Sequence, residues 1–462
     1  MAEPGKTLDL DGLLGPAAVA HPREDVRKQM LARLVEHRFQ PRGAVHCGFC
    51  SAADLAWYAS AGFGRVLVLG EATDADAPAG LAVLRSAALV RGHAVSRKSW
   101  EDLLAGHAIG PAEFTFIRFA EPGWPPMELP SSVEAVSWCY GPEGAQAQAS
   151  ATPTEGRRFV AQGLNLAWLG PRSATGTADA LFLRRPVVTM SDFGRNGRFG
   201  NQLFQRAYLR LVAQRQGAIL QLPPWAGTAL FHVEDSPPFH GPLPVVKEAT
   251  LDIAARRRLF DEPDASFAGL DFSGYAMLPT GLFAAHGAQV RADHVFDPRL
   301  AERFDRVVMP RLDGGKKLVV IHLRRGDYGY GQFFRAPCAW YQEWMSRQGF
   351  TPATHLLYIC SEDPSRYRAR FAGFTVVTAD DIGTPPQLSP YLDFLAMTRA
   401  DILAIANSSF SFFAAMLNPK ASDFVRPDAE QGGLVAFDPW GAEPVLDQKL
   451  SPEEHRRLKE ID

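Results

Sequence analysis

The sequence predicts an α/β protein of two or three domains. At 462 residues the chain is long enough for that number of hydrophobic cores. Short apolar runs bounded by turn residues alternate with helix-like stretches, the pattern of buried parallel strands joined by helices. The clearest run lies at residues 318–323 and leads directly into Arg324, Arg325, Gly326 and Asp327. Because ligands of open α/β sheets bind beyond the carboxyl ends of such strands, we expect a site at this point.

The composition is that of an ordinary soluble globular protein. Apolar residues make up 46% of the chain and charged residues 21%. The formal net charge of -3 gives no sign of a polyanion-binding surface, so we do not expect nucleic acid as a partner. Any basic site must therefore be local.

The five cysteines are few, odd in number and scattered, which argues against a disulfide framework and suits a reducing compartment. Cys47 and Cys50 form a C-x-x-C that could be a redox pair, although packing is the commoner explanation. The start of the chain lacks a basic region followed by a long apolar run, and 18 apolar residues nowhere run together. We therefore expect a cytoplasmic protein without an integral membrane segment, which leaves peripheral attachment to the inner membrane open.

Residues 1–180 are expected to form an N-terminal α/β domain. From residue 42 onward, a strand, a glycine-containing turn, a helix and a strand ending on Glu71 outline a nucleotide-binding βαβ unit. The outline is vaguely similar to the start of FkbM-type methyltransferases, in which a glycine-rich turn receives S-adenosylmethionine and a strand-end acid holds its ribose. Glu71 would be that acid. The turn at residues 46–50, HCGFC, lacks the usual small residues, so a degenerate or structural domain is the preferred interpretation.

A second unit is expected over residues 181–315. Residues 187–190 predict a strand, and Gly194, Gly197 and Gly200 a flexible turn before a helix that begins at Asn201. Glycines let a chain approach a ligand closely, and free N–H groups at a helix start favour an anion or a hydroxyl oxygen. A packing turn is the plainer alternative. Residues 222–290 are rich in proline and aromatic residues and are expected to be surface loops near an acceptor site.

A third unit is expected over residues 316–445. Arg324 and Arg325 follow its first strand. Their guanidinium groups are permanently charged and can donate two hydrogen bonds at once to phosphate oxygens. Glu362 follows a second buried strand, and Asn407, Ser408 and Ser409 follow another. Serines at the start of a helix usually cap it. Where the helix follows the carboxyl end of a strand, they can also bind a phosphate. Residues 446–462 predict a charged, solvated helix without an apolar face.

Three segments occur in an order and spacing that resemble a known family. They are residues 196–202, NGRFGNQ, residues 321–327, IHLRRGD, and residues 406–413, ANSSFSFF. Together they resemble the α-1,2-fucosyltransferases of glycosyltransferase family 11 over roughly residues 185–440. Two features depart from the family: Phe412 and Phe413 stand where tryptophans are usual, and the N-terminal 180 residues have no counterpart. The chain therefore looks like a bacterial fusion without the membrane anchor of the animal members.

The resemblance implies a GT-B-like glycosyltransferase of two Rossmann-like halves, preceded by the extra N-terminal α/β domain. Residues 181–315 would be the acceptor-side half and residues 316–445 the GDP-sugar-binding half. The donor would be GDP-L-fucose, the reaction inverting, and no cofactor or metal would be needed. We see no D-x-D motif placed at a strand end to hold a metal, and arginine charge can neutralise a departing diphosphate instead.

The resemblance also suggests roles for individual residues. Arg325 is favoured as the group that neutralises the leaving diphosphate, with Arg324 in support. Asp327 and Glu362 are both candidates for the general base, and Asp327 alternatively holds an arginine. The expected substrate-binding residues are Gly200, Asn201, Gln202, His322, Asn407, Ser408, Ser409, Phe410 and Ser411. His322 is alternatively a satisfied core histidine.

The expected reaction is transfer of fucose to a galactoside hydroxyl, in α-1,2 linkage, on a glycan or polysaccharide precursor. Three alternatives stay open: a transferase for another GDP-deoxysugar or another fucosyl linkage, a bifunctional methyltransferase–glycosyltransferase, and a non-catalytic nucleotide-sugar-binding protein. The intact Arg324, Arg325 and Asp327 speak against the last, since a decayed site would have lost at least one of them.

Overall fold

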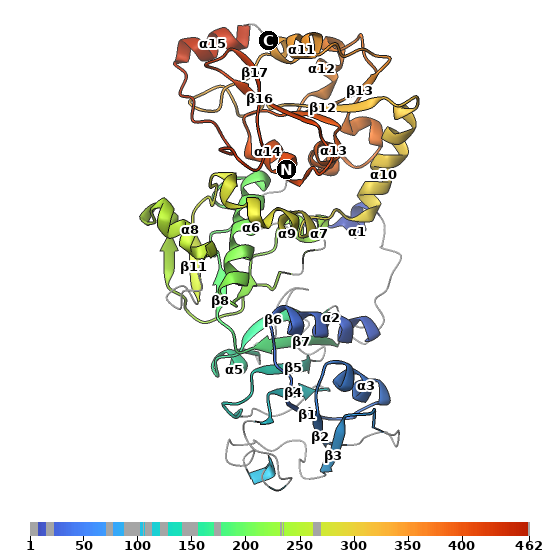
Figure 1. Cartoon of the computed structure of the whole chain (residues 1–462), viewed down its shortest axis with the longest axis vertical. Helices are drawn as coiled ribbons and strands as arrows, with labels where there is room; N and C mark the ends of the chain where they lie inside the picture. The colour runs from blue at the N-terminus through green and yellow to red at the C-terminus, as the bar shows by residue number, and fades with distance from the viewer. Residues whose placement is uncertain are drawn as a thin grey trace.

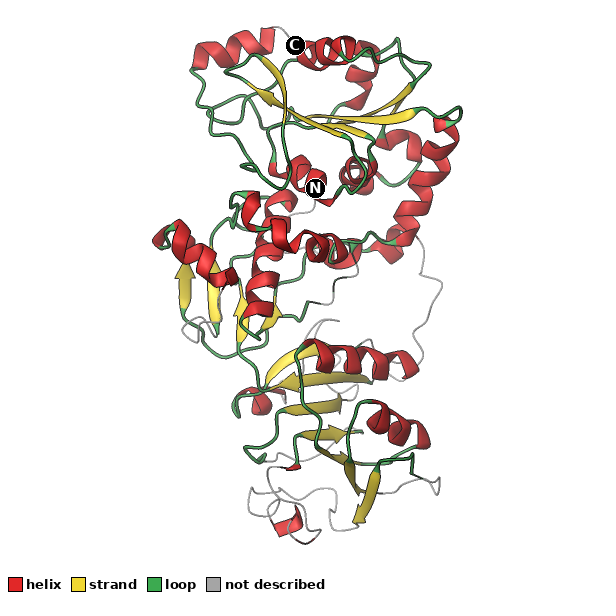
Figure 2. Ribbon diagram, in the orientation of Figure 1, coloured by secondary structure: helices red, strands yellow, loops and turns green. Residues whose placement is uncertain are grey.

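Three sheets organise the described part of the chain, and each belongs to its own α/β unit (Figures 1 and 2). The computed structural model describes residues 8–14, 23–70, 77–86, 102–104, 106, 113–120, 128–140, 156–170, 177–231, 233, 235–261 and 269–460. The N-terminal and C-terminal units lie at opposite ends of the molecule, with the second unit between them (Figure 1).

The N-terminal unit is a seven-stranded sheet of order β3-β2-β1-β4-β5-β7-β6, in which only β7 runs antiparallel to its neighbours. The last strand of this sheet ends at Leu183, so the unit extends slightly beyond residue 180. Its elements are α2 (Arg23–Glu36), β1 (Gly43–Cys47), α3 (Ala52–Ser60), β2 (Arg65–Leu69), β3 (Ala82–Ser86), β4 (Phe116–Phe119), β5 (Ala135–Tyr140), α5 (Arg157–Val160), β6 (Asn165–Leu169) and β7 (Ala178–Leu183).

The second unit is a parallel four-stranded sheet of order β10-β11-β8-β9. Residues 222–290, expected as loops, instead contain two strands, β10 and β11, and two α-helices, α7 and α8, of this unit. Strands of three or four residues are too short for a periodic pattern to be recognised. The elements are β8 (Val187–Thr189), α6 (Phe199–Arg215), β9 (Ile219–Gln221), α7 (Ala226–Leu230), β10 (Val245–Lys247), η4 (Glu248–Thr250), α8 (Ile253–Asp261), β11 (Leu270–Ser273), η6 (Thr280–Leu282), η7 (Ala284–His286), α9 (Gly287–Ala292), α10 (Pro298–Val308) and η8 (Met309–Leu312).

The third unit is a six-stranded sheet of order β14-β13-β12-β15-β16-β17, parallel except for the edge strand β17. Its elements are β12 (Lys317–Leu323), α11 (Cys338–Arg347), β13 (His355–Ser361), α12 (Pro364–Arg370), β14 (Val376–Val377), η9 (Ala379–Ile382), η10 (Pro386–Leu388), α13 (Ser389–Arg399), β15 (Ile402–Ala404), α14 (Ser409–Leu417), β16 (Asp423–Asp428), β17 (Gly433–Ala436) and α15 (Pro452–Glu460).

The central strand β12 is buried on both faces, as the sequence predicted. Leu318 and Val320 belong to the core that is shared with the second unit. Val319, Ile321 and Leu323 belong to a separate core under α11 and α12. Successive side chains of a strand point to opposite faces, so a strand between two cores reads as a continuous apolar run.

The second and third units face each other as the two halves of a GT-B-like arrangement (Figure 1). Their shared core contains residues of α6 from one half and of α13 and α14 from the other. The short helix α1 (Leu10–Leu14) packs on this core through Leu10, and Asp11 pairs with Arg299 at 2.7 Å. The α/β class with an additional N-terminal unit is therefore confirmed.

The N-terminal unit is joined to the second unit along β6 and β9. The Gln221 side chain donates to the Leu166 carbonyl at 2.7 Å, and the Ser236 hydroxyl donates to the Ala167 carbonyl at 2.6 Å. Ile219 of β9 lies in a hydrophobic cluster of the N-terminal unit. This junction lies on the side of the second unit that faces away from the third (Figure 1).

The C-terminal helix α15 differs from the expected solvated end. His455 and Leu458 are buried, and Leu458 packs into the core under α11 and α12. The two residues are three positions apart and so share one face of the helix, a stripe too narrow to stand out among the charged residues.

Among the described residues, no helix is both long and apolar enough to cross a bilayer.

Candidate active site

A large cavity lies between the second and third units. Its volume is about 1770 Å³, and residues of both units line it. Pockets for a single small ligand are typically about 300–1,000 Å³. The cavity therefore has room for more than one substrate.

The topology of the third sheet explains where the cavity forms. Strand β12 has β13 on one side and β15 on the other, both parallel to it. The chain therefore leaves the carboxyl ends of these strands at one edge, where the strand order reverses. The loops that follow the three strands carry Arg324, Glu362 and Ser408, all of which line the cavity.

Of the two arginines that follow β12, Arg324 is the one that lines the cavity. Its guanidinium pairs with Glu362 through Nη1 and with Asp327 Oδ1 through Nη2, the latter at 2.6 Å. It also lies over the Tyr328 ring, 5.3 Å from the ring centroid. The side chain is only 14% exposed, so its charge is poorly screened and its orientation is restricted.

Arg325 lies differently, although it is the next residue. It is 8% exposed and is absent from the cavity lining. Its Nε donates to the Tyr367 hydroxyl at 2.8 Å, and its guanidinium lies over the same ring at 5.2 Å. The geometry therefore places Arg324, and not the favoured Arg325, in contact with the cavity.

The two candidate bases both lie beside Arg324, but in different settings. Asp327 bridges Arg324 and Arg198, which lies 3.1 Å from its Oδ2 and belongs to the second unit. Glu362 pairs with Arg324 and also accepts the Arg325 backbone N–H at 3.1 Å. Asp327 thus links the two halves across the cavity, whereas Glu362 also holds the loop after β12.

His322 is a buried histidine that lines the cavity. Burial, with Arg324 and Arg325 nearby, lowers the pKa of its ring to about 3, so the ring is neutral near pH 7. Its Nδ1 is buried without a hydrogen-bond partner. Buried polar atoms normally have a hydrogen-bond partner, so His322 is not the fully hydrogen-bonded core histidine of the alternative interpretation. Its Nδ1 is available to a ligand.

The start of α14 meets the start of α6 at the cavity. Ser408, Ser409 and Phe410 line it, and the α14 N-cap Ser408 makes no side-chain capping bond to the helix. Backbone N–H groups at such a helix start favour an anion. The Ser409 hydroxyl donates to Asn201 Oδ1 of α6, which joins the two halves at this point.

Gly200 permits this close approach. A Cβ placed on it would lie 2.5 Å from the Phe410 backbone nitrogen and 2.9 Å from Ser409 Oγ. Any side chain at position 200 would therefore push the two helix starts apart. The glycine turn predicted from the sequence serves a contact between the halves and also borders the cavity.

Three expected substrate-binding residues lie outside the cavity lining. The Asn407 side chain exchanges hydrogen bonds with the Leu446 backbone, at 3.0 Å and 2.8 Å. Ser411 is fully buried and donates to the Ala406 and Ser408 carbonyls. Gln202 is buried within α6. These residues shape the backbone around the site, so their expected substrate contacts do not follow from this geometry.

Other residues that line the cavity were missed in the sequence. Arg198 lies within the NGRFGNQ segment, in which the glycines are the more distinctive residues. Tyr328 donates from its hydroxyl to the Asn407 carbonyl at 3.1 Å. Asp393 of α13 has a buried Oδ1 without a hydrogen-bond partner, and burial raises the pKa of its carboxyl. No local pattern marks Asp393, because the helix that carries it reads as an ordinary apolar segment.

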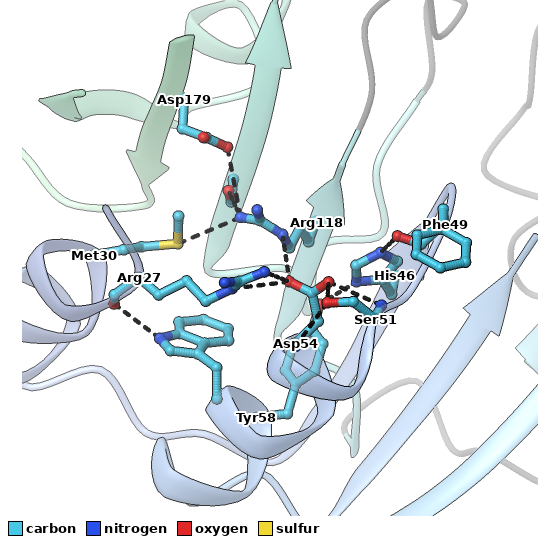
Figure 3. Close-up of polar contacts among 11 residues, drawn as sticks. Arg27, Met30, His46, Phe49, Ser51, Asp54, Tyr58, Arg118 and Asp179 are labelled. Atoms are coloured by element: carbon cyan, nitrogen blue, oxygen red, sulfur yellow. Dashed lines mark hydrogen bonds and ion pairs between the residues drawn. The ribbon is translucent and has the colours of Figure 1, made fainter. Parts of the chain in front are cut away.

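The N-terminal unit holds a second polar cluster at the end of β1 (Figure 3). Asp54 of α3 is bound by Arg27 at 2.9 Å and by the Ser51 hydroxyl at 2.6 Å. Arg118 of β4 lies 4.0 Å from Asp54 and 3.6 Å from Asp179. The N-terminus of α3, the positive end of its dipole, thus already has a carboxylate, that of Asp54, in its first turn. The charge of Asp54 is in turn neutralised by arginines.

The same cluster contains residues of a type that can bind metals. His46, Cys50 and Asp54 place ligand atoms within 4.8 Å of one another. However, the His46 ring nitrogens contact the Tyr58 hydroxyl at 3.1 Å and the Phe49 carbonyl at 3.0 Å (Figure 3). Asp54 is also held by arginines that would repel a cation, so we interpret the cluster as a closed polar core.

The structure supports neither a redox pair formed by Cys47 and Cys50 nor a cofactor-binding turn at residues 46–50. Cys47 and Cys50 are both buried, and burial raises the pKa of the Cys47 thiol, which disfavours the reactive thiolate. Glu71, the expected ribose-binding acid, lies outside the described residues. A methyltransferase-like cofactor site thus stays a prediction.

Comparison with known proteins agrees with the three motifs. The chain is 27% identical over 278 residues to the galactoside α-(1,2)-fucosyltransferase 1 of Ateles belzebuth, an alignment that covers 54% of this chain and 71% of the relative. The enzyme of the same name from Aotus azarae is also 27% identical, over 277 residues. No protein-family model matches the chain. The resemblance predicted from the sequence is confirmed, and the relatives support a glycosyltransferase.

The solved structures to which the chain is similar include fucosyltransferases. The NodZ α-1,6-fucosyltransferase co-crystallised with GDP is 16% identical and covers 55% of this chain and 98% of its own, with a TM-score of 0.37. NodZ from Bradyrhizobium gives a TM-score of 0.36 at 15% identity. A mutant of Arabidopsis thaliana FUT1 in complex with GDP is 10% identical and covers 55% of this chain and 74% of its own, with a TM-score of 0.38.

Proposed function

We propose that this protein transfers L-fucose from GDP-L-fucose to a hydroxyl of a galactoside, in α-1,2 linkage, with inversion at the transferred carbon and without a metal. The observation that carries the proposal is the position of Arg324. It lines the cavity at the end of β12, in the same cavity as the start of α14 and the unpartnered Nδ1 of His322. These groups are suited to hold a diphosphate.

The charge that develops during the reaction explains why an arginine is needed. As the bond between the sugar and the β-phosphate oxygen breaks, positive charge grows on the sugar and negative charge on the phosphate. A cation that binds the phosphate more strongly at that moment raises turnover. Arg324 pairs with two carboxylates, so it can exchange one of them for the diphosphate.

A nearby carboxylate can complete the reaction. The acceptor oxygen attacks the anomeric carbon on the face opposite to GDP, its proton passes to the carboxylate, and GDP departs. Asp327 is the better candidate because it faces Arg198 of the acceptor-side half. Glu362 is the alternative, although one of its oxygens already holds the Arg325 backbone.

Asp393 supports a guanine nucleotide as the donor. Its buried Oδ1 lacks a partner and the residue lines the cavity, so it can accept hydrogen bonds from a ligand. A guanine base presents an exocyclic N2 amino group and an adjacent ring N–H, which suit a carboxylate. Two such donors would also offset the cost of charging a buried acid.

A transfer assay with the full-length protein tests the proposal. GDP-L-fucose, GDP-mannose and UDP-galactose are each offered with a β-galactoside in the presence of EDTA, and the anomeric configuration of the product is read by NMR. We expect product from GDP-L-fucose alone, with the configuration opposite to that of the donor.

Two arginine variants make the assay specific. Arg324→Ala should lower kcat by about 10²–10³, the usual loss when one preorganised charged donor is removed. Arg347→Ala is the matched control, because Arg347 lies exposed on α11 and pairs with Glu343. Transfer that requires a divalent metal would contradict the mechanism. Binding of GDP-L-fucose without turnover to any acceptor would favour the non-catalytic alternative.

A further inference from the structure

An exposed aromatic side chain lines the part of the cavity that the second unit provides. Tyr275 is 50% exposed and borders the cavity. It follows the strand β11, in which Leu270 and Phe272 are buried. Large aromatic side chains that stay exposed within a cavity commonly contact a ligand. None of the groups suited to the diphosphate or the base lies on this strand.

The backbone around Tyr275 is held in place by Glu248. The N–H groups of Tyr275 and Ala276 both donate to Glu248 Oε2, at 2.6 Å and 3.1 Å. Arg256 pairs with the other carboxylate oxygen at 3.2 Å. The Gln205 side chain of α6 donates to the Gly274 carbonyl at 3.2 Å. The turn is thus fixed on both sides of the tyrosine.

Ala276 has a φ of +53°, in the left-handed region that non-glycine residues rarely adopt. Such backbone strain persists only where surrounding contacts maintain it, and it is concentrated at ligand-binding positions. Here the strain lies directly after an exposed tyrosine in a cavity. The turn therefore presents that ring to the cavity and does not bury it.

The third unit contributes aromatic residues to the same cavity. Tyr330 is 60% exposed, and its ring lies 5.8 Å from that of Phe333. Both residues line the cavity and belong to the loop after Arg324. The His455 ring of α15 contacts the Gly331 carbonyl of this loop at 2.9 Å. Aromatic side chains from both halves thus border one cavity.

We propose that Tyr275, with Tyr330 and Phe333, forms the subsite for a pyranose ring of the acceptor glycan. This inference rests on the proposed function and adds the residues that select the second substrate. One face of a pyranose consists of C–H groups and stacks on an aromatic ring, and a rigid tyrosine loses little entropy on binding. The donor is accounted for by Arg324, α14 and Asp393 of the third unit, and the cavity volume leaves room for a second ligand.

Steady-state kinetics with both substrates varied separate this subsite from the donor site. Tyr275→Ala should raise the KM for a β-galactoside acceptor at least about tenfold, because an aromatic stacking contact is lost. The KM for GDP-L-fucose should change less than about twofold. Tyr275→Phe and Tyr275→Trp keep a ring and should retain acceptor affinity. Tyr275→Leu keeps volume without a ring and should behave like Tyr275→Ala.

Saturation-transfer NMR on the full-length protein measures acceptor binding without turnover. Signals from the ring protons of the galactoside should appear with the wild type and with Tyr275→Phe, and weaken with Tyr275→Ala and Tyr330→Ala. An unchanged acceptor KM and unchanged NMR signals in Tyr275→Ala would overturn the subsite. If the wild type transfers no sugar, the proposed function fails, while the NMR signals still decide whether the ring binds a galactoside.

Discussion

Two adjacent arginines have different environments because of the geometry of the strand before them. Side chains alternate between the two faces of β12, so His322 and Arg324 point toward the second unit while Leu323 and Arg325 point toward the core under α12. Arg324 therefore meets the cavity, and Arg325 meets Tyr367. Of the two consecutive arginines in this motif, one thus lines the cavity and the other lies in the scaffold.

Substitution of Arg325 should affect stability more than chemistry. Arg325→Ala removes a buried donor to the Tyr367 hydroxyl, so the free energy of unfolding should fall by about 1–3 kcal/mol. The loss of kcat should be smaller than that caused by Arg324→Ala. Chemical denaturation, together with the transfer assay at a temperature where both variants are folded, checks this. A larger loss of kcat in Arg325→Ala at unchanged stability would return the catalytic role to Arg325.

At the scale of elements, the C-terminal segment fastens the loop that borders the cavity. Leu446 is bound by Asn407, whose side chain also donates to the Gln332 carbonyl at 3.3 Å. His455 of α15 contacts the Gly331 carbonyl. His455 thus holds Gly331 directly, and Asn407 connects Gln332 to Leu446 of the C-terminal segment.

Loss of the α15 contact should loosen this loop. His455→Ala removes one hydrogen bond of about 1 kcal/mol, and we expect the KM for the acceptor to rise several-fold while that for GDP-L-fucose stays near its wild-type value. Arg456→Ala is the control, because Arg456 is exposed on the same helix. Hydrogen exchange of residues 326–333 should be faster in His455→Ala only. Equal exchange in both variants would show that α15 does not hold the loop.

At the scale of the whole molecule, buried histidines make the fold sensitive to acid. Burial lowers the pKa of His294 and His322 to about 3 and that of His46 to about 4, from an ordinary value of 6.5. Between pH 6.5 and these lower values the unfolded chain binds protons that the folded chain does not. Stability is therefore fully present above about pH 6.5 and decreases as the pH falls.

The effect of His294 can be measured separately. It lies in the second unit, and its Nδ1 contacts the Val290 carbonyl at 2.7 Å. Unfolding of the wild type should become easier between pH 7.5 and pH 5.5 by about 1.4 kcal/mol for each such histidine. In His294→Gln this pH dependence should be smaller by about that amount, as followed by denaturant unfolding at the two pH values. An identical pH dependence would show that the pKa of His294 is the same in the folded and the unfolded chain.

The order of the units and the location of the site could be read from consecutive residues. An apolar run such as 318–323 records burial on both faces, and a turn that follows it must lie at the edge of the sheet. The sequence alone therefore determined the α/β class and placed the turn at residues 324–327, together with Glu362, at the carboxyl edge of the sheet. The three motifs likewise indicated a fucosyltransferase-like enzyme, in agreement with the relatives.

Only the tertiary structure decided which of these residues meet the cavity. Arg324 and Arg325 are indistinguishable in sequence, and their roles separate because one faces the other half and the other faces α12. Tyr275 and Asp393 carry no local signal, since their importance depends on contacts between segments far apart in the chain. A side chain's direction and partners follow from packing over the whole fold, and no window of neighbouring residues contains that information.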